Sequence, residues 1–113
     1  MDRKTSKENL ELLIQKDHQL AFLCELIVFA KSTVKPKTIV LFGSRAVGKA
    51  RMTSDVDLYF DLTDGDSREW ARFCSDAEES LPTLLDIDFV DAGTASQEIR
   101  NSVEREGIVI YER

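Results

Sequence analysis

Three aspartates and a glycine–serine turn have the residue types and the spacing to do chemistry on a phosphate group. Asp55 and Asp57 stand two positions apart in "SDVDL", and Asp88 lies further along the chain in "DIDFVD". In a strand, carboxylates at i and i+2 share one face and repel each other unless a cation or solvent relieves them. Mg²⁺ prefers oxygen ligands and completes its shell with water and substrate phosphates. The three carboxylates therefore indicate a metal-assisted reaction of a nucleotide.

The expected metal is Mg²⁺, with two ions in the site and Mn²⁺ as the alternative. Two ions about 3.5–4 Å apart can hold the attacking and the leaving oxygen of an in-line displacement at phosphorus. Asp86 competes with Asp88 for the third position, because the alternation of residues 84–91 places both on one strand face. A simpler alternative is a solvated acidic surface, which we favour for Asp86 or Asp61 taken alone.

A glycine turn after an apolar stretch supplies groups that can bind phosphate. The β-branched and aromatic run "TIVLF" at 38–42 is typical of a strand covered on both faces, and it ends at Gly43. A glycine lets the backbone approach an anion closely, while the Ser44 hydroxyl and exposed N–H groups can bind phosphate oxygens. The alternative is an ordinary strand-to-helix turn with a helix cap.

The same turn partly matches the phosphate-binding loop of P-loop NTPases, G-x-x-x-x-G-K-[ST]. Ala50 follows Lys49 where that motif needs a hydroxyl to hold Mg²⁺. Such an NTPase also needs a larger doubly wound sheet than 113 residues can build. We therefore expect Lys49 to lie at the surface of the turn and not to bridge phosphates.

The elements that must position these residues alternate between helix and strand. Thr5 and Glu8 have capping-box spacing, and Pro36 stops the helical pattern that follows, which predicts an N-terminal helix over about 5–32. Helices are also expected from Ser67 and from Ser96. Four stretches are typical of strands, at 38–42, 54–61, 84–91 and 108–111. The fold class is α/β (α+β), with a small mixed sheet flanked by helices.

Composition limits the class of protein. A chain of 113 residues, 42% hydrophobic and 32% charged, suits a single domain over 1–113. With a net charge of −6, general nucleic-acid binding through phosphate neutralisation is not expected. The longest apolar stretch, at 20–30, contains Glu25 and is too short to span a bilayer, so no membrane association is expected.

The start of the chain and the cysteines indicate the cytoplasm. "MDRKTSKENL" is polar and has no apolar signal core behind it. Cys24 and Cys74 lie far apart and form no C-x-x-C pair, so we expect buried or half-buried thiols in a reducing compartment.

The glycine turn and the acidic strands together resemble a known family. "GSRAVG", five further residues and "SDVDL" at 43–58 resemble the signature of the polymerase-β-like nucleotidyltransferases, most closely the minimal nucleotidyltransferases (MNT). "DIDFVD" is similar to the family's third acidic strand, and "EIRNSVEREGIVIYER" to its closing helix and strand. The resemblance begins near residue 38, which implies a polymerase-β-like fold with a catalytic core at about 38–112 behind a generic N-terminal helix.

The resemblance also implies roles for the nucleotide-binding residues. Gly43 and Ser44 would bind the β- and γ-phosphates of the incoming nucleotide. Arg45 would join them in the nucleotide site. It is the only arginine of "GSRAVG", since Val47 stands where many members of the family carry a second basic residue.

The carboxylates receive roles from the same resemblance. Asp55 and Asp57 would ligate the metal ions, and Asp88 would complete the metal site and help to activate the attacking hydroxyl. Asp88 is preferred to Asp86, because "IDFVD" matches the family's apolar-Asp-apolar-apolar-Asp pattern.

The implied activity is transfer of AMP from ATP to an acceptor hydroxyl. Larger nucleotidyltransferases carry a further domain for the acceptor, so a separate partner chain is expected here. In the family this partner is a small helical HEPN toxin, which the MNT antitoxin silences by AMPylation of a tyrosine. Two alternatives stay open: a non-catalytic antitoxin or adaptor that occludes its partner, and nucleotidyl transfer to a small molecule.

Overall fold

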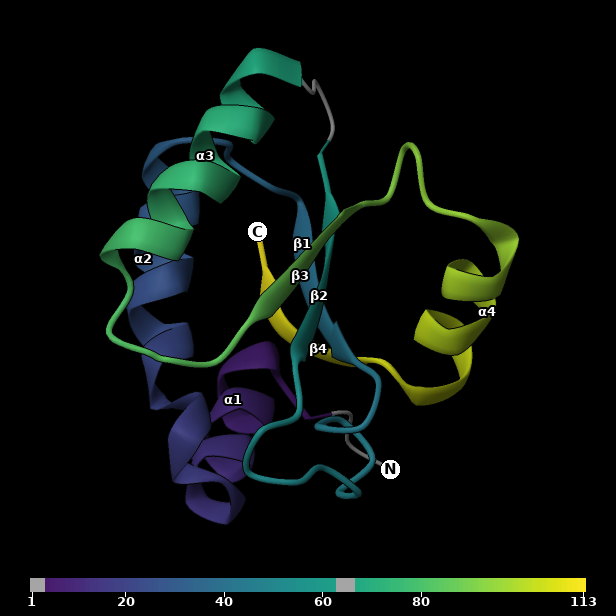
Figure 1. The fold of residues 1–113 in the computed structure, drawn as a ribbon. Helices are drawn as coiled ribbons and strands as arrows, with labels where there is room; N and C mark the ends of the chain where they lie inside the picture. The colour runs from purple at the N-terminus through teal and green to yellow at the C-terminus, as the bar shows by residue number, and fades with distance from the viewer. Residues whose placement is uncertain (1–3, 63–66) are drawn as a thin grey trace.

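A computed structural model describes residues 4–62 and 67–113. Its centre is a four-stranded mixed sheet with helices on both sides (Figure 1). The strands are β1 (Thr38–Phe42), β2 (Val56–Asp61), β3 (Ile87–Asp91) and β4 (Ile108–Glu112), in the order β3-β2-β1-β4. The predicted α/β class with a small mixed sheet is confirmed.

The strand directions bring the end of β1 and the beginnings of β2 and β3 to the same end of the sheet. β1 runs antiparallel to β2 and β4, whereas β2 and β3 are parallel. The parallel pair is joined by the helix α3 (Ser67–Ser80), as a crossover between parallel strands requires. β2 begins beside the end of β1, next to the turn that follows Phe42. β3 begins beside the start of β2, on the side away from β1.

The N-terminal segment is divided into three helical pieces: α1 (Ser6–Lys16), the 3₁₀-helix η1 (His18–Phe22) and α2 (Leu23–Ser32). The capping box of Thr5 and Glu8 is present as predicted. The prediction of one continuous helix over 5–32 is wrong, because Asp17 adopts an extended conformation with φ −141° and ψ 96°. Its side chain accepts the backbone N–H of Gln19 at 3.1 Å, a local hydrogen bond that competes with helix continuation.

The other side of the sheet carries α4 (Gln97–Glu106), which stands apart from the remaining helices in Figure 1. Ser96 caps this helix by accepting the backbone N–H of Ile99 at 3.2 Å. Among the strands, the helix contacts β1.

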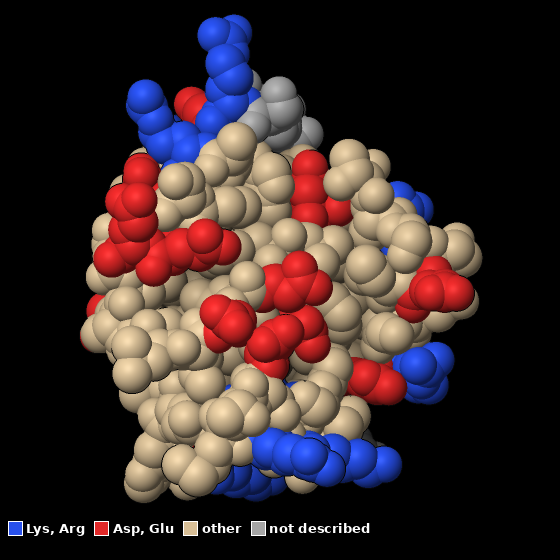
Figure 2. Space-filling model, viewed as in Figure 1, with Lys and Arg blue, Asp and Glu red and all other residues tan. Residues whose placement is uncertain are grey.

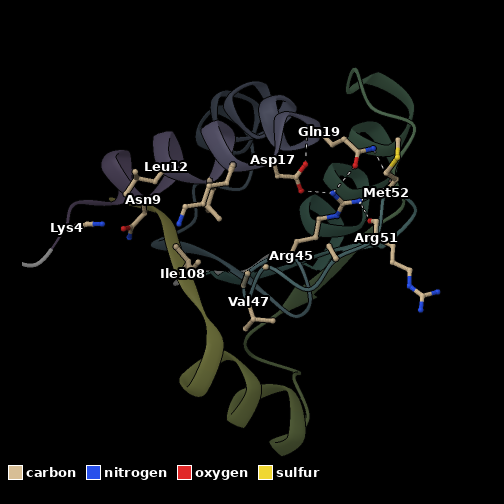
Figure 3. A pocket seen from close by; sticks show the side chains of 15 residues that line it. Lys4, Asn9, Leu12, Asp17, Gln19, Arg45, Val47, Arg51, Met52 and Ile108 are labelled. Atoms are coloured by element: carbon tan, nitrogen blue, oxygen red, sulfur yellow. Dashed lines mark hydrogen bonds and ion pairs between the residues drawn. The ribbon is translucent and has the colours of Figure 1, made fainter.

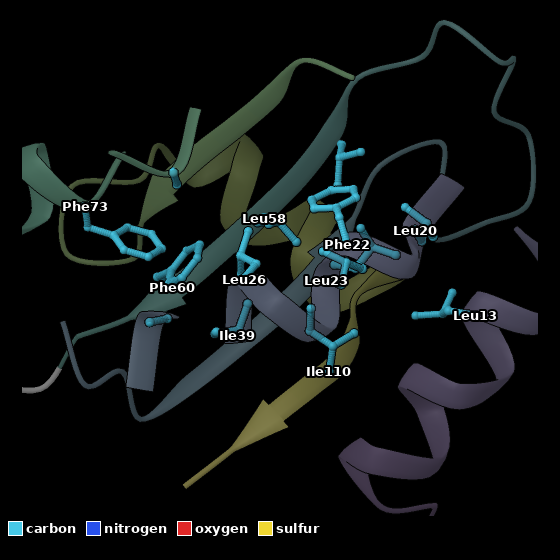
Figure 4. Close-up of a cluster of buried hydrophobic side chains, with 14 residues drawn as sticks. Leu13, Leu20, Phe22, Leu23, Leu26, Ile39, Leu58, Phe60, Phe73 and Ile110 are labelled. Atoms are coloured by element: carbon cyan, nitrogen blue, oxygen red, sulfur yellow. The ribbon is translucent and has the colours of Figure 1, made fainter. Parts of the chain in front are cut away.

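The hydrophobic core lies between the sheet and the helices α2 and α3 (Figure 4). Phe60 and Phe73 are its largest fully buried side chains, with ring centroids 5.5 Å apart. Trp70 packs edge-on against Phe60 at 5.0 Å. Val56, Leu58 and Phe60 all point into this core, which turns the alternate residues of β2 to the opposite face.

The cysteine prediction holds for one residue. Cys74 is half-buried, and packing against the core raises the pKa of its thiol to about 11. Cys24 is exposed on α2, so its predicted burial is wrong. No helix in the described residues has the length and apolar character to cross a membrane.

Candidate active site

The structure brings the predicted carboxylates together at the edge where β2 and β3 begin. Asp57 and Asp88 are register partners in the parallel pair, so their side chains lie on the same face of the sheet. Asp55 lies directly before β2, two positions from Asp57. Asp55 and Asp88 are exposed, whereas Asp57 is half-buried. Figure 2 shows acidic side chains gathered in the middle of the molecular face on which β3 lies in front.

The environment of Asp57 disfavours a negative charge. Its pKa is raised from 3.8 to about 6, first because the carboxyl group is desolvated and then because of the negative charges of Asp88 and Asp55. Repulsion between neighbouring carboxylates is the condition that a bound cation relieves. An oxygen-only donor set of this kind fits Mg²⁺ or Mn²⁺.

The carboxylates do not form a closed metal cage. Among the described residues, no group of three or more His, Cys, Asp or Glu side chains is arranged to hold a metal ion. Mg²⁺ usually takes only one or two carboxylates from a protein and draws the rest of its octahedral shell from water and phosphate. An open donor set around Asp57 fits that way of binding.

Asp86, the rival for the third position, occupies a different place. It precedes β3, and its backbone carbonyl accepts the N–H of Val56 at 2.9 Å. Its side chain is exposed and is not among the charges that raise the pKa of Asp57. The register partner of Asp57 is Asp88.

Gly43 lies against the carboxylate of Asp57. Its φ is +77°, a conformation that side chains other than glycine rarely adopt. A Cβ at this position would collide with Asp57 Oδ2 and stand 3.2 Å from Asp57 Cγ. The glycine turn and the acidic strand are therefore in direct contact.

The turn after Gly43 presents free hydrogen-bond donors. Ala46 N–H donates to the Gly43 carbonyl at 3.0 Å, and Lys49 N–H donates to the Ser44 carbonyl at 3.0 Å. Within the described residues, the backbone N–H groups of Ser44 and Arg45 donate to no protein acceptor. Consecutive free N–H groups of a turn can bind an anion. Lys49 is exposed, as predicted.

Arg45 does not offer its side chain to a nucleotide, and this corrects its predicted role. The residue is only 4% exposed, and its Nη1 forms an ion pair with Asp17 Oδ2 at 2.7 Å. Nη1 also donates to Gln19 Oε1, while Nε and Nη2 donate to backbone carbonyls of the 51–54 segment (Figure 3). A guanidinium whose N–H groups are all engaged inside the protein has none left for phosphate.

Asp17 and Gln19 thus hold the Arg45 guanidinium, a contact that the sequence did not reveal. They lie in the polar stretch "QKDHQ", inside the range 5–32 that the sequence predicts as one helix. A signal was present, since aspartate followed by a break in apolar periodicity often caps a new helical segment. The ion-pair partner of Asp17, Arg45, is 28 residues away in the sequence, and no local pattern indicates such a contact.

A cavity of about 600 Å³ lies between α1 and the loop that joins β1 to β2, and none of Asp55, Asp57 and Asp88 lines it. Lys4, Lys16 and Arg51 are among its lining residues, together with apolar side chains such as Val47 and Ile108 (Figure 3).

Comparison with known proteins decides the family. Residues 25–113 match the family described as "Polymerase beta, Nucleotidyltransferase". The chain belongs to this family. The matched range contains all four strands, the glycine turn and the three carboxylates of this nucleotidyltransferase domain.

Solved structures share the fold of the nucleotidyltransferase. A toxin–antitoxin complex with AMP-PNP matches with a TM-score of 0.66 and 24% identity, over 80% of this chain and 73% of the matched chain. A complex of the tri-AMPylated HEPN toxin of Shewanella oneidensis with an MNT antitoxin matches with 0.62 and 21%, over 84% and 73%. A proposed nucleotidyltransferase from Sulfolobus solfataricus matches with 0.55 and 21%, over 100% and 93%. No curated protein matches the chain significantly by sequence.

The contact between Gly43 and Asp57 predicts different effects for two glycine substitutions. Gly43→Ala and Gly48→Ala both place a side chain at positive φ, +77° and +74°, and both should lose about 1–2 kcal/mol of unfolding free energy. Only Gly43→Ala displaces the Asp57 carboxylate, because nothing lies within 4 Å of a Cβ at Gly48. Gly43→Ala should weaken binding of Mg²⁺-ATP at least about tenfold in calorimetry. Equal affinities of the two variants would contradict this assignment.

The raised pKa of Asp57, about 6, predicts a pH-dependent stability. The folded state binds more protons than the unfolded state between about pH 4 and 6, so its unfolding free energy falls as pH rises through this range. Asp57→Asn removes this dependence. Without divalent cations, the unfolding free energy of the variant relative to that of the wild type should rise by about 1–2 kcal/mol from pH 4 to pH 7, after allowance for solvent screening.

Urea unfolding at several pH values measures this difference. Asp61→Asn is the matched control, because Asp61 lies on the same face at the other end of β2. A difference between Asp57→Asn and wild type that stays constant with pH would refute the prediction.

Proposed function

We propose that this nucleotidyltransferase transfers AMP from ATP to a hydroxyl group of a separate partner protein. The observation that carries the proposal is the direct packing of Gly43 on the carboxylate of Asp57. It puts a turn with free N–H donors next to acidic side chains, so one bound nucleotide can contact both through its phosphates. Family membership supports the nucleotidyl transfer itself.

The metal would be held by the carboxylates of Asp55, Asp57 and Asp88. The raised pKa of Asp57, together with the register pairing of Asp57 and Asp88, supports this set over one that contains Asp86. Bound Mg²⁺, in two ions or with Mn²⁺ in its place, would supply the positive charge that offsets charge developing on the phosphate oxygens. The side chains of Asp55 and Asp88 are exposed, so a ligand can reach them.

The turn would orient the nucleotide. Its free backbone N–H groups and the Ser44 hydroxyl would donate hydrogen bonds to the β- and γ-phosphates, holding the leaving group in line with the attacking oxygen. Gly43 allows the phosphate to approach the acidic strand closely. Arg45 contributes its backbone and not its guanidinium.

Asp88 would act on the acceptor. It is exposed at the start of β3, where an incoming hydroxyl can reach it, and its carboxylate would take the proton of that hydroxyl as the bond from the hydroxyl oxygen to the α-phosphorus forms. The bond from the α-phosphorus to the oxygen that bridges to the β-phosphate would break, and the β- and γ-phosphates held at the turn would leave as pyrophosphate.

The partner we propose is a small helical HEPN toxin, and the chain is its MNT antitoxin, acting in the cytoplasm by AMPylation. Both similar complexes described above are toxin–antitoxin complexes, one with AMP-PNP and one with a tri-AMPylated HEPN toxin. The alternative is a non-catalytic antitoxin that occludes its partner, and the contact of Gly43 with Asp57 beside Asp88 argues against it.

Labelled ATP tests the proposal. With α-labelled ATP, Mg²⁺ and the product of the neighbouring reading frame, the wild-type protein should transfer label to the partner, as seen on a gel and by intact mass. Asp55→Asn should reduce transfer by at least about 10³-fold through loss of a metal ligand, while the control Asp61→Asn keeps it.

The other outcomes separate the alternatives. A stable complex without label would favour occlusion, and label in the low-molecular-weight fraction would favour a small-molecule acceptor. Retained transfer by Asp55→Asn would contradict the metal assignment.

A further inference from the structure

Arg45 forms a connection between the phosphate turn, the acidic strand and the N-terminal helices. Its side chain is 1% exposed and carries a charge that it cannot lose, so burial requires partners for the whole guanidinium. Nη1 binds Asp17 Oδ2 at 2.7 Å and Gln19 Oε1 at 3.2 Å. Nε and Nη2 both donate to the Ser54 carbonyl, at 3.1 and 2.8 Å. We call this set of contacts the Arg45 clasp.

The clasp joins the two ends of the loop between β1 and β2. Arg45 belongs to the phosphate turn at the start of this loop, and Ser54 immediately precedes Asp55. Nη2 also reaches the carbonyls of Arg51 and Met52 at 3.2 and 3.1 Å. One side chain therefore holds the start of the loop at a set separation from its end, where the first carboxylate lies.

Asp17 anchors the clasp to the rest of the fold. Its Oδ1 accepts the Gln19 N–H at 3.1 Å, and its Oδ2 binds Arg45. The Gln19 amide also donates to the Met52 carbonyl at 3.2 Å. Within the described residues, every hydrogen bond that ties residues 44–54 to a residue outside the loop involves Asp17 or Gln19. The break in the N-terminal helix turns these two side chains toward the loop (Figure 3).

We propose that the side chains of Asp17 and Arg45 act as positioning groups, which set the phosphate turn against the acidic strand without themselves touching the nucleotide. The inference rests on the proposed function for its kinetic consequence. Its structural content, a loop held by one ion pair, does not depend on catalysis. The N-terminal segment is then part of the active-site scaffold, although the family match begins only at residue 25.

Asp17→Asn tests the clasp with minimal change in shape. The amide keeps an oxygen for the Gln19 N–H but removes the charge that pairs with Arg45. Arg45→Lys keeps the charge and loses the planar fork that reaches several carbonyls. Glu11→Gln is the control, an exposed carboxylate of α1 changed in the same way.

Hydrogen exchange and kinetics provide independent measurements. In both clasp variants, amide exchange over residues 44–54 should rise about tenfold relative to β1 and β2, while Glu11→Gln is unchanged. The KM for ATP should rise about tenfold with a smaller change in kcat, because the turn that binds the phosphates is misplaced. A uniform rise in exchange over strands and loop, or no rise beyond the control, would overturn the proposal.

The two arms separate this inference from the proposed function. If the wild type transfers no AMP, the proposed function fails, and the exchange measurement still decides whether the clasp holds the loop. If transfer occurs and both clasp variants match Glu11→Gln in KM, the positioning role is wrong while the proposed function stands.

Discussion

The half-buried carboxylate of Asp57 is the constraint around which the site is organised. It is desolvated and faces the charges of Asp88 and Asp55. It also lies so close to Gly43 that no side chain would fit at that position. A protein that holds a carboxylate under these conditions does so at the expense of stability at neutral pH, unless a cation is bound. A phosphate-bound metal ion is the ligand that would relieve the repulsion and use the free donors of the turn at the same time.

The fold supplies this geometry through its strand directions. An antiparallel connection returns the chain beside β1, which puts the start of β2 next to the glycine turn, and the parallel crossover puts β3 in register on the other side of β2. The core lies on one face of the sheet, so the alternate residues of β2 are turned to the opposite face. The Arg45 clasp then limits how far the loop between the two strands can move from the N-terminal helices.

Much of this arrangement could be predicted from local patterns. Alternation identified β2 and β3, the apolar run identified β1, and the spacing of the glycine turn and the aspartates identified the family. Long-range contacts were out of reach. The role of Arg45 was misjudged because a motif shows a residue's type and place but not its burial. The break at Asp17 was missed because it is supported by an ion pair 28 residues away. The pairing of Asp57 with Asp88 needed the parallel register, which periodicity alone does not specify.

The most direct test of this account is the pKa of Asp57 measured by NMR of its side-chain carboxyl carbon, with and without Mg²⁺ and a non-hydrolysable ATP analogue. Without ligands we expect the pKa to lie near 6, well above the ordinary value of 3.8. With Mg²⁺ and the analogue it should fall below that ordinary value, because a bound cation favours the charged form. A pKa that stays near 6 at saturating ligand would show that Asp57 does not bind the metal and would contradict the account.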